Sequence, residues 1–88
     1  MDENGGVSNN LALHECVFKS EPSVLSRVLH SSPSKADLMS AQDKHGNTPL
    51  HLAVMMGKRD HIHLLLAHGA RVKVKNKQGW SPLAEAVR

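Results

Sequence analysis

Apolar residues along this chain recur at helical spacing in short segments that end at glycines. One apolar segment covers residues 49–56 and stops at Gly57, which suits the left-handed cap of a helix. A second segment covers about residues 60–67 and is followed by Gly69. Its apolar side chains share one stripe of a helix: Ile62, Leu65 and Leu66. The pattern predicts a pair of helices joined by a tight turn.

The residues on either side of this helix pair mark its start and its exit. Thr48 is a favoured N-cap residue, and Pro49 at the first helical position has no N–H group to leave unpaired. After the second helix, the stretch RVKVKNKQG over residues 71–79 alternates apolar and basic residues with a period of two. That alternation is typical of a short hairpin. The order helix, turn, helix, hairpin forms one structural unit.

This unit occurs more than once in the chain. The stretches DKHGNTPLHLAV (43–54) and NKQGWSPLAEAV (76–87) match with a shift of 33 residues. The matching pairs are Gly46/Gly79, Pro49/Pro82, Leu50/Leu83, Ala53/Ala86 and Val54/Val87. A weaker copy, LALHECV (11–17), matches TPLHLAV (48–54) with a shift of 37 residues. The additional residues fit a longer, Ser-rich connection that contains Pro33.

A period of 33 residues together with the sequence T-P-L-H is typical of ankyrin repeats. We therefore expect an all-α ankyrin-repeat solenoid of about two and a half repeats, with short hairpin fingers, truncated at the C-terminus. The expected divisions are a flexible N-terminus (1–10), a degenerate first repeat (11–32), a Ser/Pro-containing connection (33–42), a repeat (43–75) and a partial repeat with only its first helix (76–88). The expected structural motif residues are Gly46, Thr48, Pro49, Leu50, His51, Gly57, Gly69, Gly79 and Pro82.

Seven histidines raise the question of a metal or acid–base site. His61 and His63 are two residues apart, so a helix directs them to different faces and they cannot share a metal ion. His51 occupies the T-P-L-H position, where its ring is expected to hydrogen-bond to local backbone and to the cap Thr48. Ankyrin repeats normally carry Ile or Val at the position of His61. Two interpretations stay open for that ring, burial at the edge of the core or partial exposure, and we favour the second.

Composition narrows the class of protein. With 40% hydrophobic and 22% charged residues, the chain of 88 residues suits one small folded domain. The single cysteine, Cys16, cannot form an internal disulfide, which favours a reducing intracellular setting, and it aligns with the small buried position of Ala53. The sequence contains neither a nucleophile elbow nor a phosphate-binding loop. We expect a non-enzymatic protein with no catalytic residues, metal, cofactor or small-molecule substrate.

Positive charge is concentrated in the C-terminal third. From Lys58 onward seven basic residues face two acidic ones, whereas the preceding part has four basic and six acidic residues. Four of these cations define what we call the basic finger: Arg71, Lys73, Lys75 and Lys77. The finger is either a solvated edge that maintains solubility or a surface for an acidic peptide or an anionic lipid surface. Nucleic acid is not expected, because no aromatic residues alternate with the charges. Trp80 follows the finger, and two interpretations stay open for it: a second candidate contact for a partner, or packing on the hairpin of its own repeat.

Four stretches resemble one ankyrin family beyond the generic motif. They are HECVFK (14–19), DKHGNTPLHLAVMMG (43–57), LLLAHGARVKVKN (64–76) and QGWSPLAEAV (78–87), which are similar to the ankyrin repeat domain-containing protein 13 family. Ala84 and Glu85, in place of the usual His-Leu, depart from the general ankyrin pattern and belong to this likeness.

The resemblance implies a role as a protein–protein interaction module, expected as a monomer. One type within that family is a chaperone-like regulator of the biogenesis and exit of G-protein-coupled receptors, on the cytosolic face of the endoplasmic reticulum. The partner would then be a membrane receptor or its cytosolic segment. Other members carry ubiquitin-interacting motifs and act in endocytosis, which gives the alternative of an endocytic adaptor.

Overall fold

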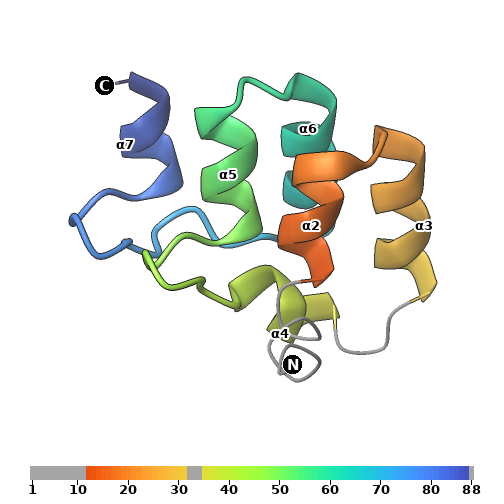
Figure 1. Cartoon of the computed structure of the whole chain (residues 1–88), viewed down its shortest axis with the longest axis horizontal. Coiled ribbons are helices and arrows are strands. Elements are labelled where there is room, and N and C mark those ends of the chain that lie inside the picture. Colours follow the sequence, from red (N-terminus) through yellow and green to blue (C-terminus); the bar gives the residue numbers. More distant parts are fainter. Residues whose placement is uncertain (1–11, 32–34, 88) are drawn as a thin grey trace.

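The computed structural model describes residues 12–31 and 35–87 of the chain (Figure 1). Within these ranges the chain forms six α-helices, joined by loops, and no β-strand. The helices are α2 (Ala12–Lys19), α3 (Pro22–Ser31), α4 (Lys35–Ser40), α5 (Pro49–Met55), α6 (Arg59–Ala67) and α7 (Pro82–Val87). The predicted all-α fold class is confirmed.

The helices are arranged in two rows. The first helices of successive units contact one another in the order α2, α5, α7, and the second helices α3 and α6 contact each other. Within each unit the two helices also pack together, α2 on α3 and α5 on α6. Figure 1 shows α7 at one end of the molecule and α3 at the other. Each helix pair therefore buries its apolar faces against the neighbouring pair, as in a solenoid.

The core between the rows is aliphatic. Its buried hydrophobic side chains are Leu13, Cys16, Val17, Leu25, Leu29, Met39, Leu50, Ala53 and Leu65. Full burial of one such Leu is worth about 1.5–3 kcal/mol, so a few of these residues carry much of the stability of a small domain. The predicted burial of the Cys16 thiol is confirmed, and burial raises the pKa of this thiol, with a smaller contribution from the Glu15 carboxylate.

The start of α5 follows the sequence signals directly. Thr48 has an extended backbone and is the N-cap, and its hydroxyl oxygen accepts a hydrogen bond from the N–H group of His51. Pro49 takes the first helical position. At the other end Met56 is the C-cap, and Gly57 follows with a φ of 68°. The local residues thus fix both ends of this helix without help from the neighbouring units.

Two connections differ from the expectation. The short helix α4 lies inside the Ser/Pro-containing connection, where Met39 is buried and Leu38 packs against the core. The alternating stretch 71–75 forms no strand, although it belongs to the described part of the chain. The carbonyl of Lys75, at the end of this stretch, accepts from the Gln42 side chain (3.1 Å). The residues that follow contact the equivalent loop of the preceding unit, the preceding finger (residues 43–47), where the N–H group of Lys77 donates to the carbonyl of His45 (3.0 Å).

This finger-to-finger contact requires a glycine at position 46. The backbone there has a φ of 79°, a region that L-residues with a Cβ atom adopt at a cost. A Cβ atom on Gly46 would lie 2.7 Å from the backbone nitrogen of Lys77 and 3.0 Å from the Cα atom of Asn76. The neighbouring finger can approach this closely only because the side chain is absent.

Replacement of Gly46 should therefore cost more stability than replacement of another positive-φ glycine. Gly69 also has a positive φ (92°), but nothing lies within 4 Å of a Cβ atom placed there. We expect Gly69→Ala to lower the free energy of unfolding by about 1 kcal/mol and Gly46→Ala by about 2 kcal/mol or more. Urea denaturation of both variants measures the difference, and equal losses would contradict the close approach described here.

Candidate interaction site

Buried histidines connect each repeat to the next. In the second unit the Nε2–H group of His51 donates to the carbonyl of Trp80 (2.9 Å), which belongs to the following finger. The other ring nitrogen, Nδ1, accepts from the Thr48 hydroxyl (2.8 Å) and lies 3.1 Å from its backbone nitrogen. Both nitrogens are therefore satisfied, which defines the tautomer with the proton on Nε2. The prediction of local bonds to Thr48 is confirmed, and the bond across the repeat boundary is additional.

The same bond recurs one unit earlier. The Nε2–H group of His14 donates to the carbonyl of Asn47 (2.7 Å), and Asn47 and Trp80 hold equivalent positions before the next helix. In this copy, however, Nδ1 is buried and has no hydrogen-bond partner in the part of the chain that is described. Burial lowers the pKa of His14, and this effect outweighs the bond to Asn47 and the nearby Asp43 carboxylate, both of which raise it.

The tips of the two fingers share one hydrogen-bond pattern, in which a side-chain oxygen of Asp43 or of Asn76 accepts from two backbone N–H groups. A side-chain oxygen of Asp43 accepts from the N–H groups of His45 and Asn47, each at 2.9 Å. One repeat later, Asn76 repeats this geometry and also donates through Nδ2 to the Asn47 side chain (2.9 Å). The sequence analysis did not single out Asp43 or Asn76. Their shared position three residues before a repeat glycine was the available signal.

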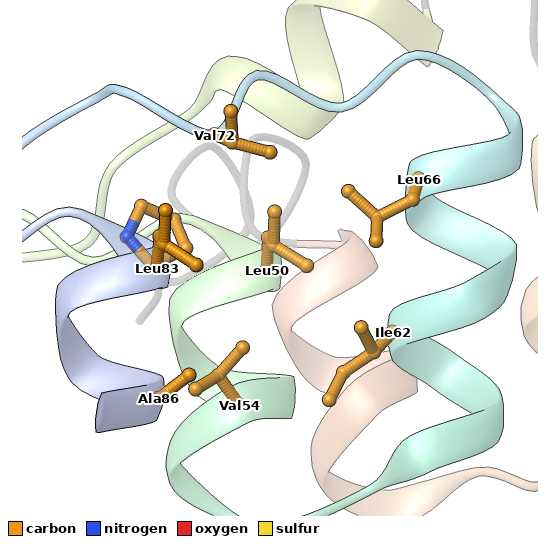
Figure 2. Close-up of a pocket in the computed structure, with 8 residues that line it drawn as sticks. Leu50, Val54, Ile62, Leu66, Val72, Leu83 and Ala86 are labelled. Atoms are coloured by element: carbon orange, nitrogen blue, oxygen red, sulfur yellow. The ribbon is translucent and has the colours of Figure 1, made fainter.

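The structure places the whole basic finger at the surface. Its four cationic residues and Trp80 are exposed. Val72, between Arg71 and Lys73, lines an apolar hollow between α5, α6 and α7 (Figure 2). The finger is thus charged on its solvent side and apolar on its inner side. Of the predicted motif residues, Gly46, Thr48, Pro49, Leu50, His51 and Pro82 are buried, and the glycines at 46, 57, 69 and 79 have positive φ angles.

The environment of His61 differs from the favoured interpretation. Its ring is buried, and its Nε2–H group donates to the carbonyl of Ser20 (2.9 Å). The prediction of a partly exposed ring is therefore wrong. Nearby, the Nζ atom of Lys58 donates to the carbonyls of Val17 (2.6 Å) and Phe18 (3.3 Å). These carbonyls belong to the last turn of α2, where a helix leaves its carbonyl groups without partners from a following turn. A side chain of the second unit therefore caps the C-terminus of α2 in the first unit.

A second histidine pair lies where α3 and α6 end. The ring centroids of His30 and His68 are 5.0 Å apart with the rings at 84°, and Lys35 Nζ donates to His68 Nδ1 (3.1 Å). Desolvation lowers the pKa of His68, and the positive charges of Lys35 and His30 lower it further. Sequence spacing did not reveal this cluster, because its members come from three separate elements.

Two further observations concern chemistry and membranes. Across residues 12–31 and 35–87, no three His, Cys, Asp or Glu side chains lie close enough together to hold a metal ion. Within the same ranges, no helix is both long and apolar enough to cross a bilayer.

Comparison with known proteins gives the class. The family model of ankyrin repeats (3 copies) matches residues 13–88, and the chain belongs to this family. Among curated proteins, the chain is 52% identical over 85 residues to ankyrin repeat domain-containing protein 13C of Mus musculus, covering 97% of this chain and 15% of that protein. It is 57% identical over 75 residues to the same-named protein of Xenopus tropicalis, covering 85% of this chain and 14% of that protein.

A more distant match supports the same relationship. Ankyrin repeat domain-containing protein 13B of Homo sapiens is 51% identical over 45 residues, which is 51% of this chain and 7% of that protein. The resemblance to the ankyrin repeat domain-containing protein 13 family is therefore confirmed, and it is strongest in extent for the 13C proteins. The chain spans about 15% of the length of the 13C relatives and 7% of the 13B protein.

The buried ring of His14 predicts a loss of stability in acid. Its folded-state pKa lies below the ordinary value of 6.5, so the unfolded chain binds the proton first as the pH falls through 6.5. The free energy of unfolding should then decrease until the pH reaches the lowered folded-state pKa. His68, whose pKa is also lowered, adds to the decrease.

Urea denaturation between pH 7.5 and pH 5 measures this loss. We expect His14→Gln, which keeps an N–H donor but cannot titrate, to show a smaller decrease than the parent chain. The control His63→Gln removes an exposed imidazole and leaves His14 in place. An equal pH dependence in the His14→Gln variant and the parent would rule out this ring as a contributor.

Proposed function

We propose that the chain is a non-catalytic protein–protein interaction module that binds an acidic segment of a partner on the basic finger. Membership of the ankyrin-repeat family supports the general role. The observation that carries the specific surface is the exposure of all four finger cations on one continuous loop. They are Arg71, Lys73, Lys75 and Lys77.

The finger has the properties of a recognition surface. Its backbone is held by neighbouring elements: the Gln42 side chain donates to the Lys75 carbonyl (3.1 Å), and Lys77 N–H bonds to the preceding finger. Cations on a fixed backbone lose less conformational entropy when they bind than cations on a free tail. The exposed indole of Trp80, next to the finger, adds an aromatic anchor of the kind that is enriched in binding hot spots.

The biological role follows from the resemblance to the ankyrin repeat domain-containing protein 13 family. We propose that the chain forms part of a chaperone-like regulator of G-protein-coupled receptor biogenesis and exit, on the cytosolic face of the endoplasmic reticulum. The acidic segment would then be a cytosolic segment of a receptor. The same resemblance supports a second role, a ubiquitin-linked endocytic adaptor, which would bind its cargo after the receptor has left the endoplasmic reticulum.

An anionic lipid surface is a competing ligand for the same cations. Polybasic clusters bind anionic membranes with about 1 kcal/mol for each Lys or Arg near the surface. The exposed Lys73, Lys75 and Lys77 would suit such a surface. A contribution of Trp80 to binding would favour a protein partner over a headgroup surface. Acidic peptides and anionic vesicles are therefore both tested as ligands.

The test measures binding of the purified chain to fluorescent peptides from acidic cytosolic segments of receptors. We expect Lys75→Glu/Lys77→Glu to weaken binding about five- to thirtyfold, because two charge reversals at about 0.5–1 kcal/mol each act together. The matched control Lys19→Glu/Arg27→Glu makes the same change of net charge on exposed residues of α2 and α3. It should bind within about twofold of the parent once circular dichroism shows that it is folded.

Vesicles with and without anionic lipid are titrated in parallel. If the chain binds anionic vesicles but not peptides, and the same double variant loses this binding, then the ligand of the basic finger is a lipid surface and not a protein partner. Peptide binding that the finger reversal leaves unchanged would contradict the proposed surface. Co-expression of the chain with a receptor separates the two biological roles. Retention of the receptor in the endoplasmic reticulum supports the first role, and a change in endocytosis of the receptor supports the second.

A further inference from the structure

Three basic side chains from three separate helices meet at the end of α6, and we call them the histidine–lysine cluster. His68 is the C-cap residue of α6, His30 belongs to the last turn of α3, and Lys35 is the first residue of α4. The Nζ atom of Lys35 donates to Nδ1 of His68 (3.1 Å), and the ring centroids of His30 and His68 are 5.0 Å apart. This cluster ties α4 to the second helices of both units.

The bond between Lys35 and His68 requires a neutral imidazole. A lysine ammonium only donates hydrogen bonds, so Nδ1 of His68 must be the acceptor and the proton of the ring lies on Nε2. A protonated ring carries an N–H group on both nitrogens. Its Nδ1–H group would then face the Lys35 ammonium as a second donor and a second positive charge, and two charges at this distance repel each other. The bond and the protonated ring therefore exclude each other.

The surroundings of His68 offer little to neutralise a second positive charge. Apart from α4, the helices packed against α6 are α3 and α5. The charged and titratable residues of these three helices are Arg27 and His30 on α3, Lys35 and Asp37 on α4, and His51 on α5. Asp37 is exposed and two residues from Lys35, so it projects from a different side of α4, and the His51 ring is bonded to Thr48 and Trp80.

The charges of α6 itself lie away from the cluster. Its charged and titratable residues are Arg59, Asp60, His61 and His63, all of them five or more residues before His68. Desolvation has the largest effect on the pKa of His68 and lowers it, and the nearby charges that lower it further are those of Lys35 and His30. The named neighbours thus act on the ring with one sign.

The first turn of α4 depends on this bond. α4 has only 6 residues, and a helix of that length is unstable in water without tertiary contacts. Its last turn is anchored by the buried side chain of Met39, whereas its first turn is held by Lys35 and by the partial burial of Leu38. A positive charge at the start of a helix is unfavourable, so Lys35 without its acceptor would weaken the turn.

We propose that the histidine–lysine cluster is an acid-sensitive latch, which holds the first turn of α4 at the end of α6 while His68 is neutral and releases that turn when His68 takes up a proton. After release the Lys35 ammonium is hydrated, and protonated His68 lies at a helix C-terminus, where a positive charge is favourable. Release uncovers Leu38, whereas Met39 stays buried. The latch is independent of the proposed binding of an acidic segment by the basic finger.

The direction of the pH dependence follows from proton linkage. With the turn closed, the pKa of His68 lies below 6.5. With the turn open, the ring is better hydrated and the Lys35 charge is farther away, so the pKa returns toward 6.5. The open state therefore binds the proton first as the pH falls through 6.5. Its population rises until the pH passes the lowered pKa of the closed state, and the latch is closed at neutral pH.

NMR of the ¹⁵N-labelled 88-residue chain between pH 7.5 and pH 5 tests the latch. The ring signals of His68 give its pKa, and relaxation gives the backbone order parameters of residues 36–38. We expect these order parameters to fall from about 0.85 to below about 0.6 with the same midpoint as the His68 ring, while those of α5 and α6 stay constant. A parallel fall in α4, α5 and α6 would mean that acid unfolds the whole domain, and constant values in α4 would mean that nothing is released. Either result overturns the proposal.

Two variants examine the bond from its two ends. His68→Asn places an amide oxygen near the position of Nδ1, which can accept from Lys35 but cannot titrate, so α4 should stay ordered down to pH 5. Lys35→Met removes the donor and its charge, so residues 36–38 should be mobile already at pH 7.5 and the pKa of His68 should rise.

The matched control His63→Gln removes an exposed imidazole from the same helix and should behave like the parent. Acid release in His68→Asn equal to that of the parent would overturn the proposal. The same holds for a first turn in Lys35→Met that is as ordered as in the parent at pH 7.5.

Discussion

The hydrogen bond from a buried histidine to the backbone of the next unit is the interaction on which the arrangement depends. His51 is buried and must satisfy both ring nitrogens inside the protein, because an unpaired buried polar atom is costly. Thr48 supplies one partner from the same helix start, and the Trp80 carbonyl supplies the other. Satisfying one side chain therefore fixes the spacing between two units. His14 repeats the bond across the earlier boundary.

The fingers follow from this spacing. Once the helix starts of two units are held together, the connecting loops come close enough for Lys77 N–H to reach His45 and for Asn76 to reach Asn47. The Lys77 N–H group and the Lys75 carbonyl are thereby bonded to the preceding finger and to the Gln42 side chain, and not to a neighbouring strand. The result is a loop with cations outside and Val72 inside. The segment that carries the cations thereby also lines the apolar hollow between α5, α6 and α7.

The first unit depends on the second for more than apolar cover. Lys58 and His61 donate to three carbonyls at the end of α2 and in the turn that follows it. A positive charge at a helix C-terminus is favourable in addition to the hydrogen bonds themselves. His61 at a position usually occupied by Ile or Val is thus compatible with a buried ring, because Ser20 provides an acceptor. The polar substitution exchanges apolar burial for a directed contact between units.

The amino-acid sequence by itself determined the repeat period, the class of fold, the start of α5 at Thr48 and Pro49, and the glycines that end the helices. These features depend on local backbone preferences and on apolar spacing, both of which are written in neighbouring residues. Only the tertiary structure decided that His61 is buried, that residues 71–75 form no strand, that α4 is a helix, and that Leu66 and Leu83 line the apolar hollow. Each of these outcomes depends on partners about 30 to 40 residues away or on an adjacent element that covers a face, and such contacts leave no trace in local spacing.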